Sequence, residues 1–282
     1  MRARIFVALQ YLLPQHLLSR LVGILARSRA GWIRRPLLSF FLRTYRPDLS
    51  DALNPDPHSY ASFNDFFTRA LKAGARPLST LPRAIVSPVD GRISALGETT
   101  AGRIIQAKGR DYALRSLLAG DERLTALVQG GPFMTIYLAP FNYHRIHMAL
   151  GGRLVGAWYV PGRLFSVNDA TAANVDGLFA RNERLVLEFS GELGPHILVM
   201  VGALFVGSMG TVWHGDIAPG RQGAPLALPL PAAAAAVAAQ GAELGRFNMG
   251  STVILLLPPG SARWDGVSAG QVLRVGQHIG QQ

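Results

Sequence analysis

From residue 84 onward, the chain alternates short aliphatic and β-branched runs with turn-forming glycine, proline and aspartate. Examples are AIVSPVDGRIS at 84–94, PFMTIYLAP at 132–140, HILVMVGALFVG at 196–207 and TVILLLP at 252–258. Runs of this length between turn signals predict β-strands, with one helical stretch near YALRSLLAG at 112–120. The sequence therefore predicts a β-dominated α+β fold, built on a sandwich or barrel-like domain.

The first 75 residues differ, because arginines alternate there with apolar runs. These runs are IFVALQYLL at 5–13, LLSRLVGIL at 17–25 and PLLSFFL at 36–42. No acidic residue precedes Asp48, so residues 1–47 account for nine of the formal net charge of +11. The arginines of residues 1–47 are Arg2, Arg4, Arg20, Arg27, Arg29, Arg34, Arg35, Arg43 and Arg46. The pattern predicts helices lying in an anionic membrane surface, with guanidinium groups among the lipid phosphates.

Two other interpretations of the N-terminus are weaker. A basic arm that binds nucleic acid would be less apolar. A cleaved signal peptide would not have its apolar run interrupted by Gln10, Pro14 and His16. The glycines and β-branched residues of HILVMVGALFVGSMGTVW at 196–213 favour a core strand over a membrane-spanning helix. We expect the chain to lie on a membrane and not to bind nucleic acid.

The amino-acid composition excludes several kinds of functional site. The chain has no cysteine, which excludes disulfides, thiolate metal sites and cysteine nucleophiles. The segment APLALPLPAAAAAVAAQ at 224–240 is of low complexity, and we expect a loop followed by a short helix there.

Two motifs before the C-terminal strand carry titratable side chains. Asp90 stands at a Pro/Gly turn in SPVDGRI, where capping of its own backbone is the ordinary role. APFNYHRIHMAL at 139–150 contains His144, Arg145 and His147. Two histidines three residues apart suggest a metal site, but no third ligand stands nearby, so no metal is expected.

The segment GRFNMGSTVILLLPPG at 245–260 places Gly250 and Ser251 directly before a predicted strand. Ser251 is either part of an ordinary strand entry or a nucleophile. The G-x-S-x-G elbow of α/β-hydrolases is absent. An Asp/His/Ser triad is compatible with the sequence, since such groups come from any position in a chain, and spacing alone does not decide.

Taken in order, these motifs resemble those of phosphatidylserine decarboxylase proenzymes. The set comprises FNDFFTR at 63–69, SPVDGRI, AKGRDYALRSLL at 107–118, YHRIHM, YVPGRLFSVN at 159–168, LFARNERLV at 178–186 and GRFNMGST. The sequence departs from the family pattern at Met249, where leucine is common, and at Ala149, where proline is frequent. Neither departure removes a reacting group.

The resemblance implies a pyruvoyl-dependent enzyme that makes its own prosthetic group. His147, oriented by Asp90, would act as the base while Ser251 attacks the carbonyl of Gly250. Cleavage after Gly250 would leave chains 1–250 and 251–282, the second starting with a pyruvoyl group derived from Ser251. This group would bind phosphatidylserine as a Schiff base, and loss of carbon dioxide would give phosphatidylethanolamine.

Further expectations follow from the same resemblance. Residues 1–75 would form the membrane-associating segment, and 76–282 the catalytic domain. His144 and Arg145 would bind the lipid phosphate or carboxylate, although His144 could equally be structural. The enzyme would be a heterodimer of its own two chains, and a higher oligomer is compatible with this. It would be a peripheral protein on the cytoplasmic face of the cell membrane.

Three alternatives remain at this stage. A lipid hydrolase would use Asp90, His147 and Ser251 without cutting the chain. A membrane-binding β module would need no catalysis. A pyruvoyl decarboxylase of a related phosphoserine lipid would have the same catalytic residues.

Overall fold

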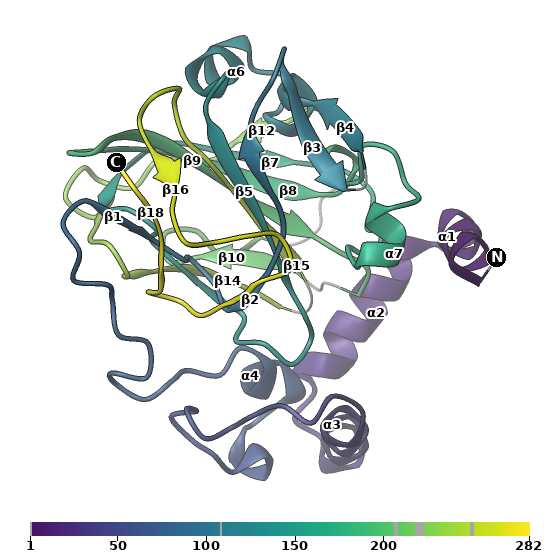
Figure 1. Cartoon of the computed structure of the whole chain (residues 1–282). Coiled ribbons are helices and arrows are strands. Elements are labelled where there is room, and N and C mark those ends of the chain that lie inside the picture. The colour runs from purple at the N-terminus through teal and green to yellow at the C-terminus, as the bar shows by residue number, and fades with distance from the viewer. Residues whose placement is uncertain (1, 108, 206–207, 218–222, 249–250) are drawn as a thin grey trace.

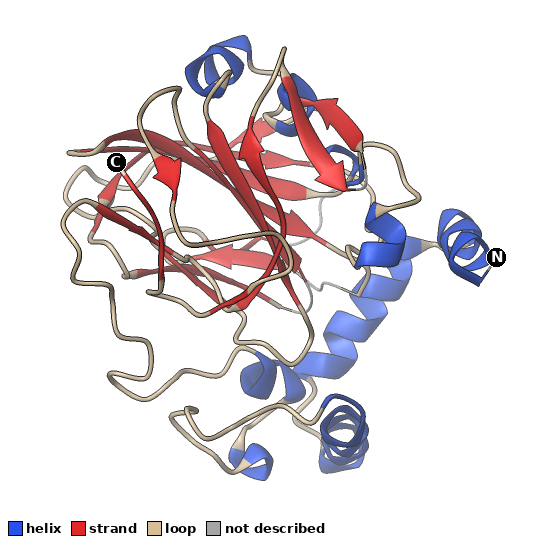
Figure 2. Cartoon of the chain, viewed as in Figure 1, coloured by secondary structure: helices blue, strands red, loops and turns tan. Residues whose placement is uncertain are grey.

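The computed structural model describes residues 2–107, 109–205, 208–217, 223–248 and 251–282 (Figure 1). Helices come first and a β-rich body follows, as predicted from the sequence (Figure 2). The helical elements before the first strand are α1 (Arg2–Leu12), α2 (Gln15–Arg27), α3 (Gly31–Tyr45), η1 (Pro57–Ser59) and α4 (Phe63–Phe67). The later ones are α5 (Leu114–Leu117), α6 (Glu122–Val128), α7 (Asp169–Ala172) and α8 (Leu178–Arg181).

Within the described residues, the largest sheet has nine antiparallel strands. Eight of them follow the order β12-β7-β8-β9-β15-β5-β2-β17, and β13 also pairs with β7. Their bounds are β12 (Leu226–Ala227), β7 (Gly152–Val160), β8 (Arg184–Gly191), β9 (Gly194–Gly202), β15 (Ser251–Leu256), β5 (Pro132–Leu138), β2 (Gly91–Glu98), β17 (Val272–Leu273) and β13 (Val237–Ala238). β15 lies between β9 and β5, so both its edges are paired.

Three smaller sheets complete the described part of the body. The four-stranded sheet has the order β11 (Gly215–Ile217), β10 (Met209–Thr211), β14 (Glu243–Phe247) and β6 (Arg145–His147). The three-stranded sheet has the order β1 (Ala84–Val86), β18 (His278–Gln281) and β16 (Arg263–Trp264). β3 (Arg103–Ala107) and β4 (Arg110–Ala113) form a hairpin.

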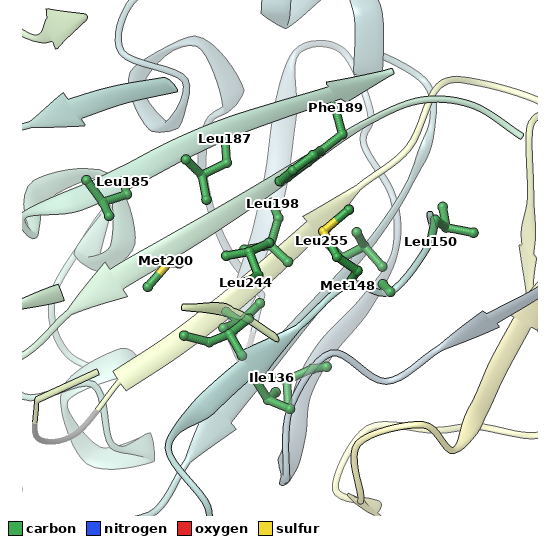
Figure 3. Packing of buried hydrophobic residues seen from close by; sticks show 14 of the residues in the cluster. Ile136, Met148, Leu150, Leu185, Leu187, Phe189, Leu198, Met200, Leu244 and Leu255 are labelled. Carbon is green, nitrogen blue, oxygen red and sulfur yellow. The ribbon is translucent and has the colours of Figure 1, made fainter. Parts of the chain in front are cut away.

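The central strands of the nine-stranded sheet are buried on both faces, which explains the unbroken apolar run of β15. Val253 and Leu255 belong to the core shared with the four-stranded sheet, where Leu244 of β14 also packs (Figure 3). Side chains alternate along a strand, so those of Ile254 and Leu256 point to the opposite face. The core on that face includes residues of α5, α6 and α8.

Helix α2 packs against the body with its polar and small residues. Gln15, Ser19, Gly23 and Ala26 are buried. Leu17, Leu21 and Ile24 are instead 56, 49 and 61% exposed. This reverses the usual amphipathic arrangement of a helix on a globular protein, in which the apolar stripe faces the core.

Buried hydrogen bonds hold the first two helices in this orientation. Gln10 accepts from the backbone N–H of Ser166 at 2.8 Å, and Gln15 accepts from that of Leu164 at the same distance. Ser19 accepts from the N–H of Phe205 at 3.1 Å. No helix of the described residues combines the length and apolar content needed to cross a membrane.

One prediction of local structure is wrong. Residues 224–240 contain no helix; they form β12 and β13, which pair with β7, and a turn between them. Backbone pairing with β7 outweighs the helix propensity of the alanine run, which is only five residues long.

Candidate active site

Ser251 is the first residue of β15 and lies opposite Leu138 of β5 and Gly202 of β9. Its side chain is fully buried, and its Oγ has no hydrogen-bond partner among the described residues. Alternation along the strand places this side chain on the same face as Val253 and Leu255, toward the four-stranded sheet. Met249 and Gly250, including the predicted cleavage point, lie outside the described residues.

The loop from Leu138 to His144 runs beside the chain that leads into Ser251. At one end Leu138 pairs with Ser251, and at the other the N–H of Phe247 donates to the His144 carbonyl at 3.0 Å. Asn142 shapes the loop, since its Oδ1 accepts from the N–H of Ala139 at 2.8 Å. His144 and Ser251 are thereby brought to the same end of the sandwich.

His144 is a buried, neutral histidine. Its ring centroid lies 4.1 Å from that of Phe67, and its Nδ1 lies 2.9 Å from the carbonyl oxygen of Asn142. Burial lowers the pKa of His144 to about 3. A carbonyl next to Nδ1 requires the proton on that atom, which leaves Nε2 unprotonated. Nε2 is buried and has no partner in the described part of the chain.

His147 is anchored at both ring nitrogens. Its Nδ1 lies 2.8 Å from the Gly241 carbonyl and its Nε2 lies 3.0 Å from the Tyr143 hydroxyl. The carbonyl again selects the tautomer in which Nδ1 carries the proton and Nε2 is basic. Burial lowers the pKa of His147 below its ordinary value, so the ring is neutral at pH 7. Gly241 has a φ of +78°, a conformation that favours glycine at this carbonyl.

Asp90 does not orient His147 through a hydrogen bond, which corrects the expected dyad. Its carboxylate accepts from Arg76 through Nε at 2.9 Å and Nη2 at 2.6 Å, and from the N–H of Val275 at 2.9 Å. The fork of Arg76 matches the two carboxylate oxygens. Asp90 still lies near His147, because its charge favours the protonated ring and the His147 N–H donates to the Pro88 carbonyl at 2.8 Å.

Arg145 has partners within the protein. Its Nη1 donates to Glu243 at 2.8 Å and its Nε donates to the Thr68 carbonyl at 2.9 Å. The ion pair with Glu243 already balances its charge. Through these contacts, Arg145 links β6 to β14 and to the end of α4. Its contact with the substrate stays a prediction.

Arg76 and Tyr143 are site residues that the sequence analysis missed. Together with Asp90 they line a cavity of about 170 Å³, whose other residues include Arg69 and Asn142. Arg76 stands outside every motif, so no local signal could have identified it. Tyr143 is part of YHRIHM but was not singled out, because its contact with His147 depends on how the loop folds.

The described residues contain no group of three or more histidine, aspartate or glutamate side chains arranged to hold a metal ion. His144 and His147 both direct Nδ1 at backbone carbonyls.

A family model described as "Phosphatidylserine decarboxylase" matches residues 63–281, and a second, described as "PSD", matches residues 5–46. Curated proteins named "Phosphatidylserine decarboxylase proenzyme" are similar over nearly their whole length. The protein of Ectopseudomonas mendocina is 49% identical over 282 residues, covering 99% of each chain. That of Methylibium petroleiphilum is 50% identical over 285 residues, covering 98% of this chain and 97% of its own.

Proposed function

Because the chain belongs to the phosphatidylserine decarboxylase family, a family of carboxy-lyases, we propose that it is a self-processing enzyme. It converts Ser251 into a pyruvoyl group and decarboxylates phosphatidylserine to phosphatidylethanolamine. The observation that carries the proposal is the buried Ser251 Oγ, without a partner among the described residues, at the start of a central strand directly after a glycine.

Self-cleavage begins with the Ser251 hydroxyl. Its proton passes to a base as Oγ attacks the Gly250 carbonyl, and the Gly250–Ser251 amide becomes an ester. Loss of the Ser251 Cα proton then expels the Gly250 carboxylate and leaves dehydroalanine. Addition of water and release of ammonia give the ketone. Glycine before the serine leaves the carbonyl open to attack.

We assign the base to His147, whose Nε2 is the unprotonated nitrogen. The Gly241 carbonyl accepts from Nδ1–H of this ring and so fixes its tautomer. In the catalytic triad of a hydrolase, a carboxylate has this role. The Asp90 charge favours the imidazolium that forms. His144 has the same tautomer and an Nε2 without a described partner, so comparison of His147→Ala with His144→Ala tests the assignment.

The residues present fit the pyruvoyl group. Its precursor, Ser251, lies in a buried position at the start of β15, close to the loop that carries His144. Once formed, the ketone supplies an electron sink for the bond that loses carbon dioxide. His144, on the loop that starts opposite Ser251, and His147, three residues later, are able to hold or move a proton. Each is neutral at pH 7 because burial lowers its pKa.

The exposed apolar stripe of the N-terminal helices supports a substrate held in a bilayer. Besides α2, the stripe includes Leu9 and Leu12 of α1 and Trp32 and Phe40 of α3, all more than half exposed. Arginines border it, as expected for a surface that meets anionic lipid. We therefore place the enzyme at the cytoplasmic face of the cell membrane, as a peripheral protein.

Assays of carbon dioxide release test the substrate assignment. Purified protein is incubated with vesicles containing phosphatidylserine, with vesicles containing other phosphoserine lipids, and with free serine. We expect release from phosphatidylserine with wild type and none with Ser251→Ala. Release from free serine at the same rate, or from Ser251→Ala, would contradict the proposal.

A further inference from the structure

The residue nearest to the cleavage point on its N-terminal side, within the described residues, is held by its side chain from two directions. Asn248 is 1% exposed. Its Nδ2 donates to the Ser208 hydroxyl at 2.6 Å, and its Oδ1 accepts from Nδ2 of Asn64, in α4, at 3.1 Å. Its backbone N–H also donates to the Ser208 carbonyl at 3.0 Å. Asn248 is therefore fixed in both position and orientation.

Helix α2 reaches the same cluster through its last residue. Arg27 donates from Nη2 to the Ser208 hydroxyl at 2.8 Å, and the same atom lies 3.2 Å from Asp216 of β11. Asp216 also pairs with Arg246 of β14 at 3.3 Å. Burial alone would raise the pKa of Asp216, but contacts with Asn248, Arg27 and Arg246 lower it, so this link is ionic at neutral pH.

We propose that Asn248 is a positioning residue for self-cleavage, and that Arg27 acts on it through Ser208. This inference rests on the proposed function of Ser251. The N-terminal helices then belong to the cleavage apparatus, in addition to carrying the membrane-facing stripe.

Very little chain separates Asn248 from the reacting bond. Gly250 follows Asn248 by two residues, which span at most about 7 Å when extended. The serine that attacks is fixed on the other side by the pairing of β15 with β5 and β9. Attack requires Oγ and the carbonyl carbon to approach in a narrow geometry, so fixing both flanks raises the fraction of reactive conformations.

The contact between Asn64 and Asn248 joins two segments that lie far apart in sequence. Because both amides are buried, replacing Asn248 alone would leave its partners without a hydrogen bond, which costs free energy. α4 is a helix of only five residues, yet it directs Asn64 at the segment that leads into Gly250.

Cleavage during cell-free synthesis of the full chain tests the proposal, with the single chain and its two products followed over time on denaturing gels. Removal of the side-chain contacts of Asn248 in Asn248→Ala should lengthen the half-life of the single chain roughly tenfold. Arg27→Ala should lengthen it about threefold, and the double variant by less than the product because both act through Ser208.

Two matched controls isolate the effect. Asn54→Ala removes an exposed asparagine that donates to Ser59 at 2.6 Å. Arg263→Ala removes an exposed arginine of β16, outside the N-terminal helices. Both should cleave at the wild-type rate. Thermal unfolding of each variant, measured on an uncleavable Ser251→Ala background, separates loss of positioning from loss of folding.

The outcomes distinguish this inference from the proposed function. If wild type, Asn248→Ala and Arg27→Ala all cleave at one rate, self-cleavage stands and the positioning role is wrong. If wild type remains a single chain, the function proposed for Ser251 fails, and the inference fails with it. If Asn248→Ala does not fold, the rate of folded Arg27→Ala relative to Arg263→Ala decides, with slower cleavage supporting the positioning role and an equal rate overturning it.

Discussion

His144 and His147 lie three residues apart, and their rings have similar surroundings but one different contact. Both present Nδ1 to a carbonyl, and burial lowers the pKa of both. They differ at Nε2, which meets the Tyr143 hydroxyl in His147 and has no described partner in His144. At the residue scale, the protonation state of these rings governs the proposed chemistry.

The pH dependence of self-cleavage follows from His147. A base must be neutral, and burial lowers the pKa of His147 below its ordinary value of 6.5. We expect the cleavage rate to fall as pH decreases, with its midpoint below pH 6.5. Quenched time courses in buffers from pH 4.5 to 8 measure it. A half-maximal rate above pH 6.5 would be incompatible with His147 as the base.

Glu183 gives a second pH-dependent prediction, this time on stability. It is buried, its Oε2 has no partner in the described chain, and burial raises its pKa to about 7. The folded state therefore binds more protons than the unfolded state between about pH 4.5 and 7, and stability falls as pH rises through this window. Glu183→Gln removes the cost of the charge.

On a Ser251→Ala background, Glu183→Gln should be more stable than its parent at pH 8, by an amount on the order of 1 to 3 kcal/mol. At pH 4.5 the two should be similar. Denaturant unfolding at both pH values measures this, with exposed Glu192→Gln as control. Equal gains at both pH values would show that ionisation of Glu183 is not the cause.

At the scale of the element, α2 has a different partner on each face. Its buried face uses Gln15 and Ser19 to bind backbone groups of the body, and its apolar face is exposed. A helix of this kind, whose polar residues face inward, is suited to lipid more than to water.

Replacement of two exposed residues tests the lipid contact. The pair Leu21→Asp and Ile24→Asp should reduce binding to anionic vesicles at least about tenfold, because two apolar side chains would no longer enter the lipid. Vesicle co-sedimentation measures it. Val237→Asp, at an exposed position on β13, serves as the control. Unchanged binding of the α2 variant would mean that this stripe does not contact lipid.

The elements that the sequence predicted best are those with strong local signals. The sequence predicted strand β15 and a helical stretch at 112–120, where α5 lies. The motifs also gave Asp90, His147 and Ser251 as candidate site residues. The sequence did not predict the partners of Asp90 and His147. Arg76 and Gly241 come into contact with these residues only when the chain folds. The predicted helix in 224–240 failed for a related reason, since pairing with a distant strand overrode local propensity.

At the scale of the whole molecule, the proposed cut falls at a place that the fold can tolerate. The chain 251–282 contributes β15 to the middle of the largest sheet and β18 to the sheet that also holds β1. Across the proposed cut, β15 thus pairs with β5 and β9, and β18 pairs with β1.

We therefore expect the two products to stay together after cleavage. Size-exclusion chromatography under native conditions should elute both in one peak, which separates only in denaturant. Backbone pairing of β15 on both edges, together with its buried side chains, is the physical reason. A free chain of residues 251–282 in native buffer would contradict this view of the fold.

The central claim is that Ser251 is converted into a pyruvoyl group with cleavage after Gly250, and intact mass under denaturing conditions tests it most directly. The account predicts two chains for the wild type, the smaller one lighter than its plain-serine mass by the change of an amine to a ketone. Ser251→Ala should remain one chain. A wild-type protein that stays whole after long incubation would contradict the account and leave Ser251 as a conventional nucleophile or a simple strand entry.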